Sequence, residues 1–263
     1  MGIVRHGSPG PAAVPHHGAV QTTLREARAT LVPDMSGPHG PLPPLLLVLT
    51  VVTGLVDAFS YLALGRVFVA NMTGNVVFLA FSLAGSSGFS VSASVLALAA
   101  FMAGAAAGGR LVHVMPGQRA RLLLAVTAVQ LVLVAGASVL GATVDLPAEG
   151  AARGGLIVLL GLAMGGQNAV VRRLGVPDLT TTVLTLTITG MAADSVLGGG
   201  RSGKVGARLL SAAAMFLGAL AGAALIGHGH PDVTLLCATI ALVAVACALV
   251  PFRSSAGRWA QTS

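Results

Sequence analysis

Eight long apolar stretches, separated by short polar or charged segments, follow one another from residue 42 onward. They are residues 42–64, 66–84, 91–112, 122–142, 155–171, 178–197, 207–227 and 233–251. An α-helix needs about 20 apolar residues to span the hydrocarbon core of a bilayer, and each stretch is close to that length. The pattern predicts an all-α integral membrane protein with one membrane domain at residues 42–252.

The composition agrees with this class and excludes others. The chain is 55% hydrophobic and 9% charged, whereas a soluble domain has about 25% charged residues. The net charge of +7 comes from basic residues scattered singly or in small groups between apolar stretches. That arrangement is typical of loops that orient a membrane protein, so we expect a lipid bilayer as partner and no nucleic acid.

The positions of Lys and Arg bear on how many stretches cross. If 66–84 and 178–197 enter the membrane without crossing it, only Arg66 and Arg153 of the 15 basic residues lie outside. Basic residues favour the cytoplasmic side. We therefore predict six full transmembrane helices, two broken or non-crossing segments and both termini cytoplasmic, in a bacterial inner membrane. Eight full spans remain the alternative, with nine basic residues on one side and six on the other.

The two non-crossing segments occupy equivalent places in an internal repeat. Two copies are expected, at residues 43–142 and 154–251, in which Asp57-Ala58 matches Asn168-Ala169. Three crossings per copy make the copies inverted, as in many transporters, and four would make them parallel. Gly-x3-Gly motifs in the spans suit packing within the chain, and a homodimer is the alternative.

The ends of the chain differ from the membrane domain. Residues 1–41 are rich in Pro, Gly and His and are expected to form a disordered cytoplasmic tail without a signal peptide. Residues 253–263 are a second, short cytoplasmic tail. The irregular spacing of the histidines does not predict a metal site, and the pattern leaves open whether translation starts at Met1 or Met35.

Polar residues inside the apolar stretches are the candidates for a functional site. Asp57 lies well inside the first stretch, and Asn71, Thr73, Gly74 and Asn75 interrupt the second. Ionisable groups within spans usually face a cavity or a partner. Asp57 is a candidate proton relay or cation ligand, or a structural group bonded to the interrupted segment. A Gly between Thr and Asn can end a half-helix whose exposed end binds a ligand.

The second copy offers neutral counterparts. Gln167 and Asn168 precede a pair of arginines, and Thr182 and Thr185 belong to a Thr-rich run. Because Asn168 matches Asp57, a shared site would have one ionisable wall and one neutral wall. Interhelical hydrogen bonding without ligand binding is the alternative for this group.

These considerations favour a secondary transporter or permease for a small solute or ion, with a midplane site between the copies. The alternative is a non-transporting assembly or regulatory protein. None of the common protease, hydrolase or phosphate-binding motifs occurs, so we expect no enzyme activity, no cofactor and no metal.

Two stretches together resemble a known family. They are TGLVDAFSYLALGRVFVANMTGNVVFLAFSLAG (53–85) and GGQNAVVRRLGVPDLTTTVLT (165–185). Both are similar to sequences of the YoaK-like family of bacterial inner-membrane proteins of unknown function, over about residues 42–251. The resemblance implies a multi-span inner-membrane fold and no established substrate. The family's second stretch reads closer to Thr-Gly-Thr, where this chain has Thr185-Leu186-Thr187.

Overall fold

The structure is a computed structural model that describes residues 16–176, 179, 189, 205–253 and 258–260. The named elements in this part of the chain are all helical. They are α1 (His16–Leu31), α2 (Leu42–Ala63), α3 (Met72–Leu83), α4 (Val91–Val114), α5 (Arg119–Thr143), α6 (Gly150–Leu174), α8 (Val205–Gly227), α9 (Pro231–Leu249) and the short 3-10 helices η2 (Val250–Phe252) and η3 (Arg258–Ala260).

Six of the described helices are long and apolar enough to cross a bilayer: α2, α4, α5, α6, α8, and α9 continued by η2. This confirms the six expected long spans within the described residues. The helix in the first segment predicted not to cross, α3, has only 12 residues. At 1.5 Å per residue it is about 18 Å long, too short for the hydrocarbon core. The second such segment, 178–197, lies almost entirely outside the described residues.

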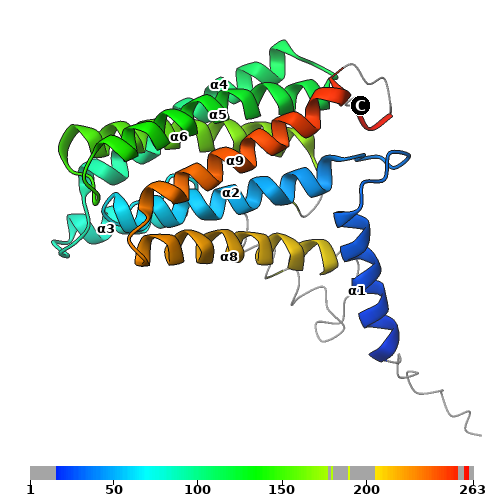
Figure 1. Ribbon diagram of the computed structural model, residues 1–263, viewed down its shortest axis with the longest axis horizontal. Coiled ribbons are helices and arrows are strands. Elements are labelled where there is room, and N and C mark those ends of the chain that lie inside the picture. Colours follow the sequence, from blue (N-terminus) through cyan, green and yellow to red (C-terminus); the bar gives the residue numbers. More distant parts are fainter. Residues whose placement is uncertain (1–15, 177–178, 180–188, 190–204, 254–257, 261–263) are drawn as a thin grey trace, which may run out of the picture.

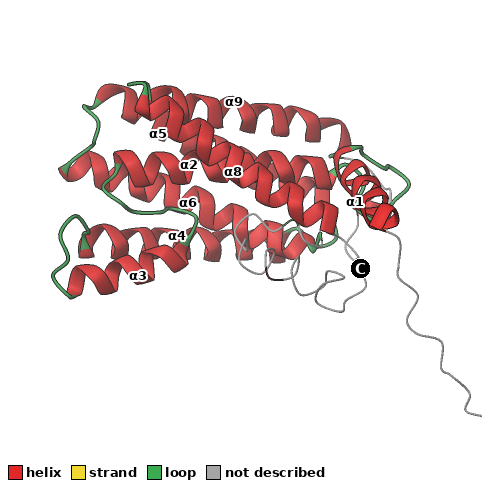
Figure 2. Ribbon diagram, turned by 90° about the horizontal axis from the view of Figure 1, so that it is seen from below, coloured by secondary structure: helices red, strands yellow, loops and turns green. Residues whose placement is uncertain are grey.

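The six long helices lie side by side, with α3 at one end of the bundle and α1 at the other (Figure 1). The closest pairs are α4 with α6 and α2 with α8, and α5 packs against both α6 and α9. Figure 2 shows α3 lying along α4. The first and second long helices of the chain, α2 and α4, are thus paired with helices from the other half of the sequence.

Glycines bring the backbones of these pairs into contact. A Cβ on Gly104 of α4 would overlap the carbonyl oxygen of Leu162, and one on Gly165 of α6 would overlap that of Phe101. The α2–α8 pair has the same feature at Gly54 and Gly218. These small residues therefore serve packing within the chain and are not available to a second copy.

The N-terminal region contains a helix that the composition did not predict. We expected residues 1–41 to be disordered, but His16–Leu31 forms α1, which packs against α8. The carboxylate of Glu26 accepts a hydrogen bond of 3.1 Å from the backbone N–H of Gly206, one residue after α8 begins. Residues 32–41 then lead into α2.

Arg119 connects the segment before α2 and the C-terminal region to the bundle. Arg119 is 7% exposed, and its guanidinium donates to the carbonyl oxygens of Pro38 (3.0 Å) and Trp259 (3.3 Å) and to that of Leu174. Pro38 precedes α2, Trp259 lies in η3 and Leu174 is the last residue of α6. Three segments that are distant in sequence therefore meet at one end of the bundle. In the C-terminal tail predicted at 253–263, Trp259 is buried.

Candidate functional site

The chain turns back into the bundle directly after α2. Gly65 and Arg66 have φ values of 79° and 59°, in the left-handed region that reverses the chain direction and costs strain at a non-glycine residue. The backbone N–H of Arg66 donates to the carbonyl oxygen of Tyr61 at 2.9 Å and closes the turn. Residues 67–71 then run back alongside α2 as a non-helical segment, which we call the return segment.

Asp57 holds the return segment. Its Oδ1 accepts hydrogen bonds from the backbone N–H groups of Val69 (3.1 Å) and Ala70 (2.9 Å), and its Oδ2 accepts one from the side-chain amide of Asn71 (2.5 Å). Asp57 is 2% exposed. A buried carboxylate needs such donors, because lipid and packed apolar side chains supply none. The structure thus places Asp57 and Asn71 in direct contact.

Asn75 also binds the return segment, through two hydrogen bonds. Its Oδ1 accepts from the backbone N–H of Phe68 at 2.9 Å, and its Nδ2 donates to the carbonyl oxygen of Phe68 at 2.6 Å. Only a side chain with a donor and an acceptor side by side makes this pair of bonds. Asn75 is fully buried, so its polar atoms are used within the protein.

Thr73 and Gly74 lie differently from what the sequence suggested. The helix α3 begins at Met72, so both residues belong to its first turn and the break in the helix precedes them. Thr73 is exposed on the outside of α3. A Cβ on Gly74 would come within 2.7 Å of the Phe68 ring, so this glycine makes room for an aromatic side chain and does not end a half-helix.

Aromatic rings complete the packing around α3. Tyr61 stacks on Phe68 with ring centroids 5.1 Å apart, and Phe78 stacks on Phe89 at the same distance. The guanidinium of Arg66 lies 5.6 Å from the centre of the Phe89 ring. The residues that follow α3 therefore return to the turn that follows α2, so 66–84 begins and finishes at the same end of the bundle.

Gln167 joins a separate polar cluster in the middle of the bundle. Its Oε1 accepts from Nε2 of Gln130 on α5 at 2.6 Å, and its Nε2 donates to Oγ1 of Thr53 on α2 at 3.2 Å. All three side chains are buried. Thr53 precedes Asp57 by four positions and shares its face of α2. The two clusters therefore lie one helical turn apart.

Sequence reasoning missed Thr53 and Gln130. Gln130 is one of the few polar residues in a long apolar stretch, which was the available signal for it. Two side-chain oxygen atoms of α5, Gln130 Oε1 and Thr127 Oγ1, are buried and have no hydrogen-bond partner among the described residues. Three positions apart, they lie on one face of the helix. Buried oxygens without a donor are typical places for a bound water or a ligand.

The remaining predicted residues are not brought into these clusters by contacts that the structure describes. Asn168 donates to the carbonyl oxygen of Met164, one turn earlier in α6, at 2.8 Å. Thr182 and Thr185 lie outside the described residues. The predicted site is thus divided: Asp57, Asn71 and Asn75 fix the return segment, and Gln167 lies in the central cluster.

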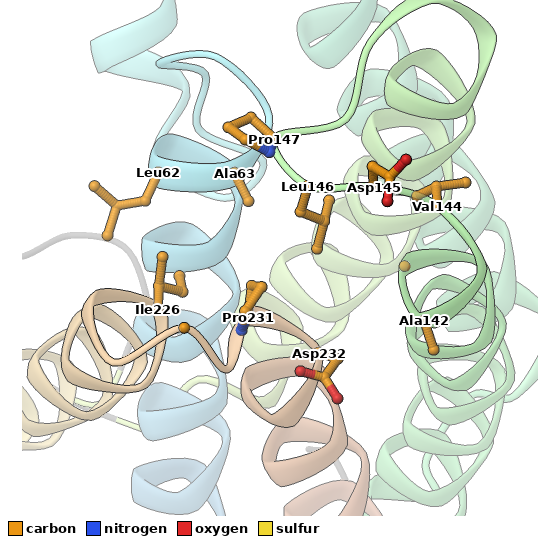
Figure 3. Close-up of a pocket in the computed structure, with 12 residues that line it drawn as sticks. Leu62, Ala63, Ala142, Val144, Asp145, Leu146, Pro147, Ile226, Pro231 and Asp232 are labelled. Atoms are coloured by element: carbon orange, nitrogen blue, oxygen red, sulfur yellow. The ribbon is translucent and has the colours of Figure 1, made fainter.

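A pocket of about 480 Å³ lies at the end of the bundle where α2 finishes. Figure 3 shows two carboxylates around it, Asp145 from the loop after α5 and Asp232 from the first turn of α9. Leu62 and Ala63 form part of its wall, close to the turn at Gly65 and Arg66. This end of the bundle therefore offers a water-accessible, acidic hollow.

Comparison with known proteins agrees with the membrane fold and adds no activity. The chain is 32% identical over 154 residues to the UPF0700 transmembrane protein YoaK of Bacillus subtilis (strain 168). That match covers 57% of this chain and 65% of the relative, so it spans just under two thirds of the relative's length. No solved structure matches significantly. The family described as "Protein of unknown function (DUF1275)" matches residues 45–248, and the chain therefore belongs to the DUF1275 family.

Proposed function

We propose that this protein is a secondary transporter or permease for a small solute in the bacterial inner membrane. The observation that supports this most is the central cluster of Thr53, Gln130 and Gln167, which joins three long helices deep inside the bundle. Burying amides in a membrane is costly unless they are bonded. Here one amide oxygen, Gln130 Oε1, has no partner among the described residues.

The central cluster suits a neutral, polar solute. Its members are amides and a hydroxyl, and they carry no charge. Together they offer both donors and acceptors. A solute with an N–H or O–H group would satisfy Gln130 Oε1 and the hydroxyl of Thr127 on the same face of α5. The acidic pocket beside Asp145 and Asp232 would be the outer opening.

Two inverted copies would place this cluster between the repeats. Gly165 follows Gly54 by 111 positions, and Gly218 follows Gly104 by 114. Each of the four packs against the backbone of a helix in the other half. A two-fold relation between two three-helix copies would produce such contacts, in which equivalent glycines at similar offsets each pack against the other copy. Both termini would then lie on the same side, because the number of spans is even, and the positions of the arginines favour the cytoplasmic side.

Asp57 would couple the return segment to protons or cations. The ionised carboxylate accepts from Val69, Ala70 and Asn71, and a protonated carboxyl group has less acceptor capacity. Protonation would thus loosen the return segment next to the central cluster. If transport by an Asp57→Asn variant keeps its pH dependence unchanged, this coupling role is wrong.

The transport proposal is tested with purified protein in liposomes. Swelling in urea or glycerol gradients reports neutral solutes, and a pH-sensitive dye in the lumen reports protons. Gln130→Leu and Gln167→Leu should each slow the transported probe at least about tenfold, which corresponds to about 1.4 kcal/mol in the barrier. The matched control is Val132→Ala on α5, because Val132 is 71% exposed and faces away from the bundle.

A non-transporting assembly or regulatory role is the second candidate. It is favoured by the Asp57 carboxylate, whose oxygens are already bonded within the chain. In this case wild-type liposomes should pass urea, glycerol and protons no faster than empty ones. The central cluster would then serve packing, and Gln130→Leu would change the stability of the protein without changing any flux.

A further inference from the structure

A second pocket, of about 510 Å³, lies at the end of the bundle opposite the acidic one. It is enclosed by the end of α4, the loop of residues 115–118, the start of α5 and the end of α6. Its polar lining comes from His113, Gln118, Arg172 and Arg173. We call it the basic pocket.

The charge in the basic pocket is of one sign. No acidic residue is among the described residues that line it. Arg172 and Arg173 are exposed, and within the described chain neither guanidinium has a carboxylate partner. Two adjacent guanidinium groups provide the planar donor arrays that phosphate oxygens accept.

The start of α5 borders the same pocket through Gln118 and Leu122. Gln118 precedes the helix and makes no side-chain cap, so the first N–H groups of α5 have no side-chain partner from the cap position. Arg121 donates to Oε1 of Gln118 at 2.7 Å, which leaves the NH₂ group of Gln118 as a donor. A helix N-terminus with donors beside it favours an anion.

The other wall of the basic pocket is apolar. Val112, Met115 and Leu122 contribute to it, next to Pro116. These side chains lie where long membrane helices end, at the level of the polar headgroups. A cavity with cationic groups on one side and apolar side chains on the other matches a phosphate group that carries a hydrophobic or uncharged remainder.

We propose that the basic pocket binds one phosphate group, held by Arg172 and Arg173 together with the donors at the start of α5. The phosphate belongs either to the headgroup of an anionic phospholipid or to a soluble phosphorylated molecule. This binding does not depend on the transport proposal, because no residue of the basic pocket belongs to the central cluster.

The test uses the full chain in a neutral detergent. Native mass spectrometry measures the binding of short-chain phosphatidylglycerol against phosphatidylcholine, and inorganic phosphate is added as a competitor. The variant is Arg172→Gln/Arg173→Gln. The matched control is Arg110→Gln/Arg253→Gln, which removes the same charge from two exposed arginines outside the pocket lining. Thermal unfolding checks that both variants are folded.

We expect the pocket variant to bind phosphatidylglycerol roughly 30-fold more weakly, the effect of two basic residues near an anionic surface. The control should bind within about twofold of wild type, because its charges lie outside the lining. If phosphatidylglycerol stays bound in excess inorganic phosphate, the pocket is assigned to lipid. If inorganic phosphate displaces the lipid, the pocket is assigned to soluble phosphates. Equal weakening in both variants, or no preference for phosphatidylglycerol or inorganic phosphate over phosphatidylcholine, overturns the proposal.

Discussion

At the scale of single residues, the contact between Asp57 and Asn71 decides how the return segment is held. Oδ2 of Asp57 faces the NH₂ group of Asn71, while Oδ1 accepts from Val69 and Ala70. In Asp57→Asn the new amide can keep Oδ1 in place, but its NH₂ group then meets the NH₂ group of Asn71. We expect a loss of about 1–3 kcal/mol in the free energy of unfolding, measured by denaturant titration in micelles.

Exchanging the two side chains provides the control. In Asp57→Asn/Asn71→Asp the donor and the acceptor change places, so the contact is restored with opposite direction. The double variant should recover part of the stability, with a coupling energy of about 0.5–3 kcal/mol. Asn71→Asp alone brings two carboxylates together and should be the least stable of the three. If the losses of the single variants simply add in the double variant, the contact does not hold the segment.

At the scale of helices, glycines set the distance between α4 and α6. A Cβ on Gly165 would overlap the carbonyl oxygen of Phe101, so Gly165→Ala must push the helices apart. We expect about 1–3 kcal/mol of destabilisation, as for other overpacked contacts. Gly109→Ala on α4 is the control, because nothing lies within 4 Å of its added Cβ. It should be neutral or stabilise by up to about 1 kcal/mol. Similar unfolding midpoints for both variants would contradict this account.

The sequence predicted those elements that are determined by residues close together in the chain, and it misplaced an element boundary that depends on a distant contact. The six long spans follow from the length of each apolar stretch, and the arginine positions indicated that 66–84 does not cross. The break in that segment was placed at Gly74, whereas the structure has it before Met72. The break is set by Asp57, which reaches residues 12 and 13 positions later. No local pattern contains such a contact.

Only one of the three members of the central cluster was predicted, for a related reason. Gln167 was identified because it stands next to Asn168, in a stretch with a counterpart in the first copy. Gln130 has no polar neighbour in sequence, and its role depends on which face of α5 meets α6. Helix faces in a long apolar stretch carry little periodicity when lipid and protein neighbours are both apolar. Partners from different helices therefore become visible only once the bundle is assembled.

At the scale of the whole molecule, the two ends of the bundle differ in charge and in the segments that gather there. The end of α2 meets the loop before α6, since the N–H of Ala148 donates to the carbonyl oxygen of Ala63 at 3.0 Å. The other end holds Arg119 with Leu174 and the start of α8 beside α1. The end of α6 and the start of α8 thus lie at the same end of the bundle, the one that holds Arg119 (Figure 1).

This arrangement predicts the membrane topology. Reporter tags inserted after Ser86 and after Glu149 should report the same, outer side, because both positions lie near the end of α2. A tag after Gly117, in the loop that precedes α5, should report the cytoplasm. Tags after Val176 and before α8 should report the cytoplasm too. The readout is a paired alkaline phosphatase and fluorescent protein fusion at each position. A cytoplasmic tag after Ser86, with an outer tag after Val176 and a cytoplasmic tag before α8, would mean that both 66–84 and 178–197 cross, which would restore eight spans and make the two copies parallel. Asp57 would then hold a crossing helix in place, and its clasp on the return segment could not act as the proposed proton-sensitive element.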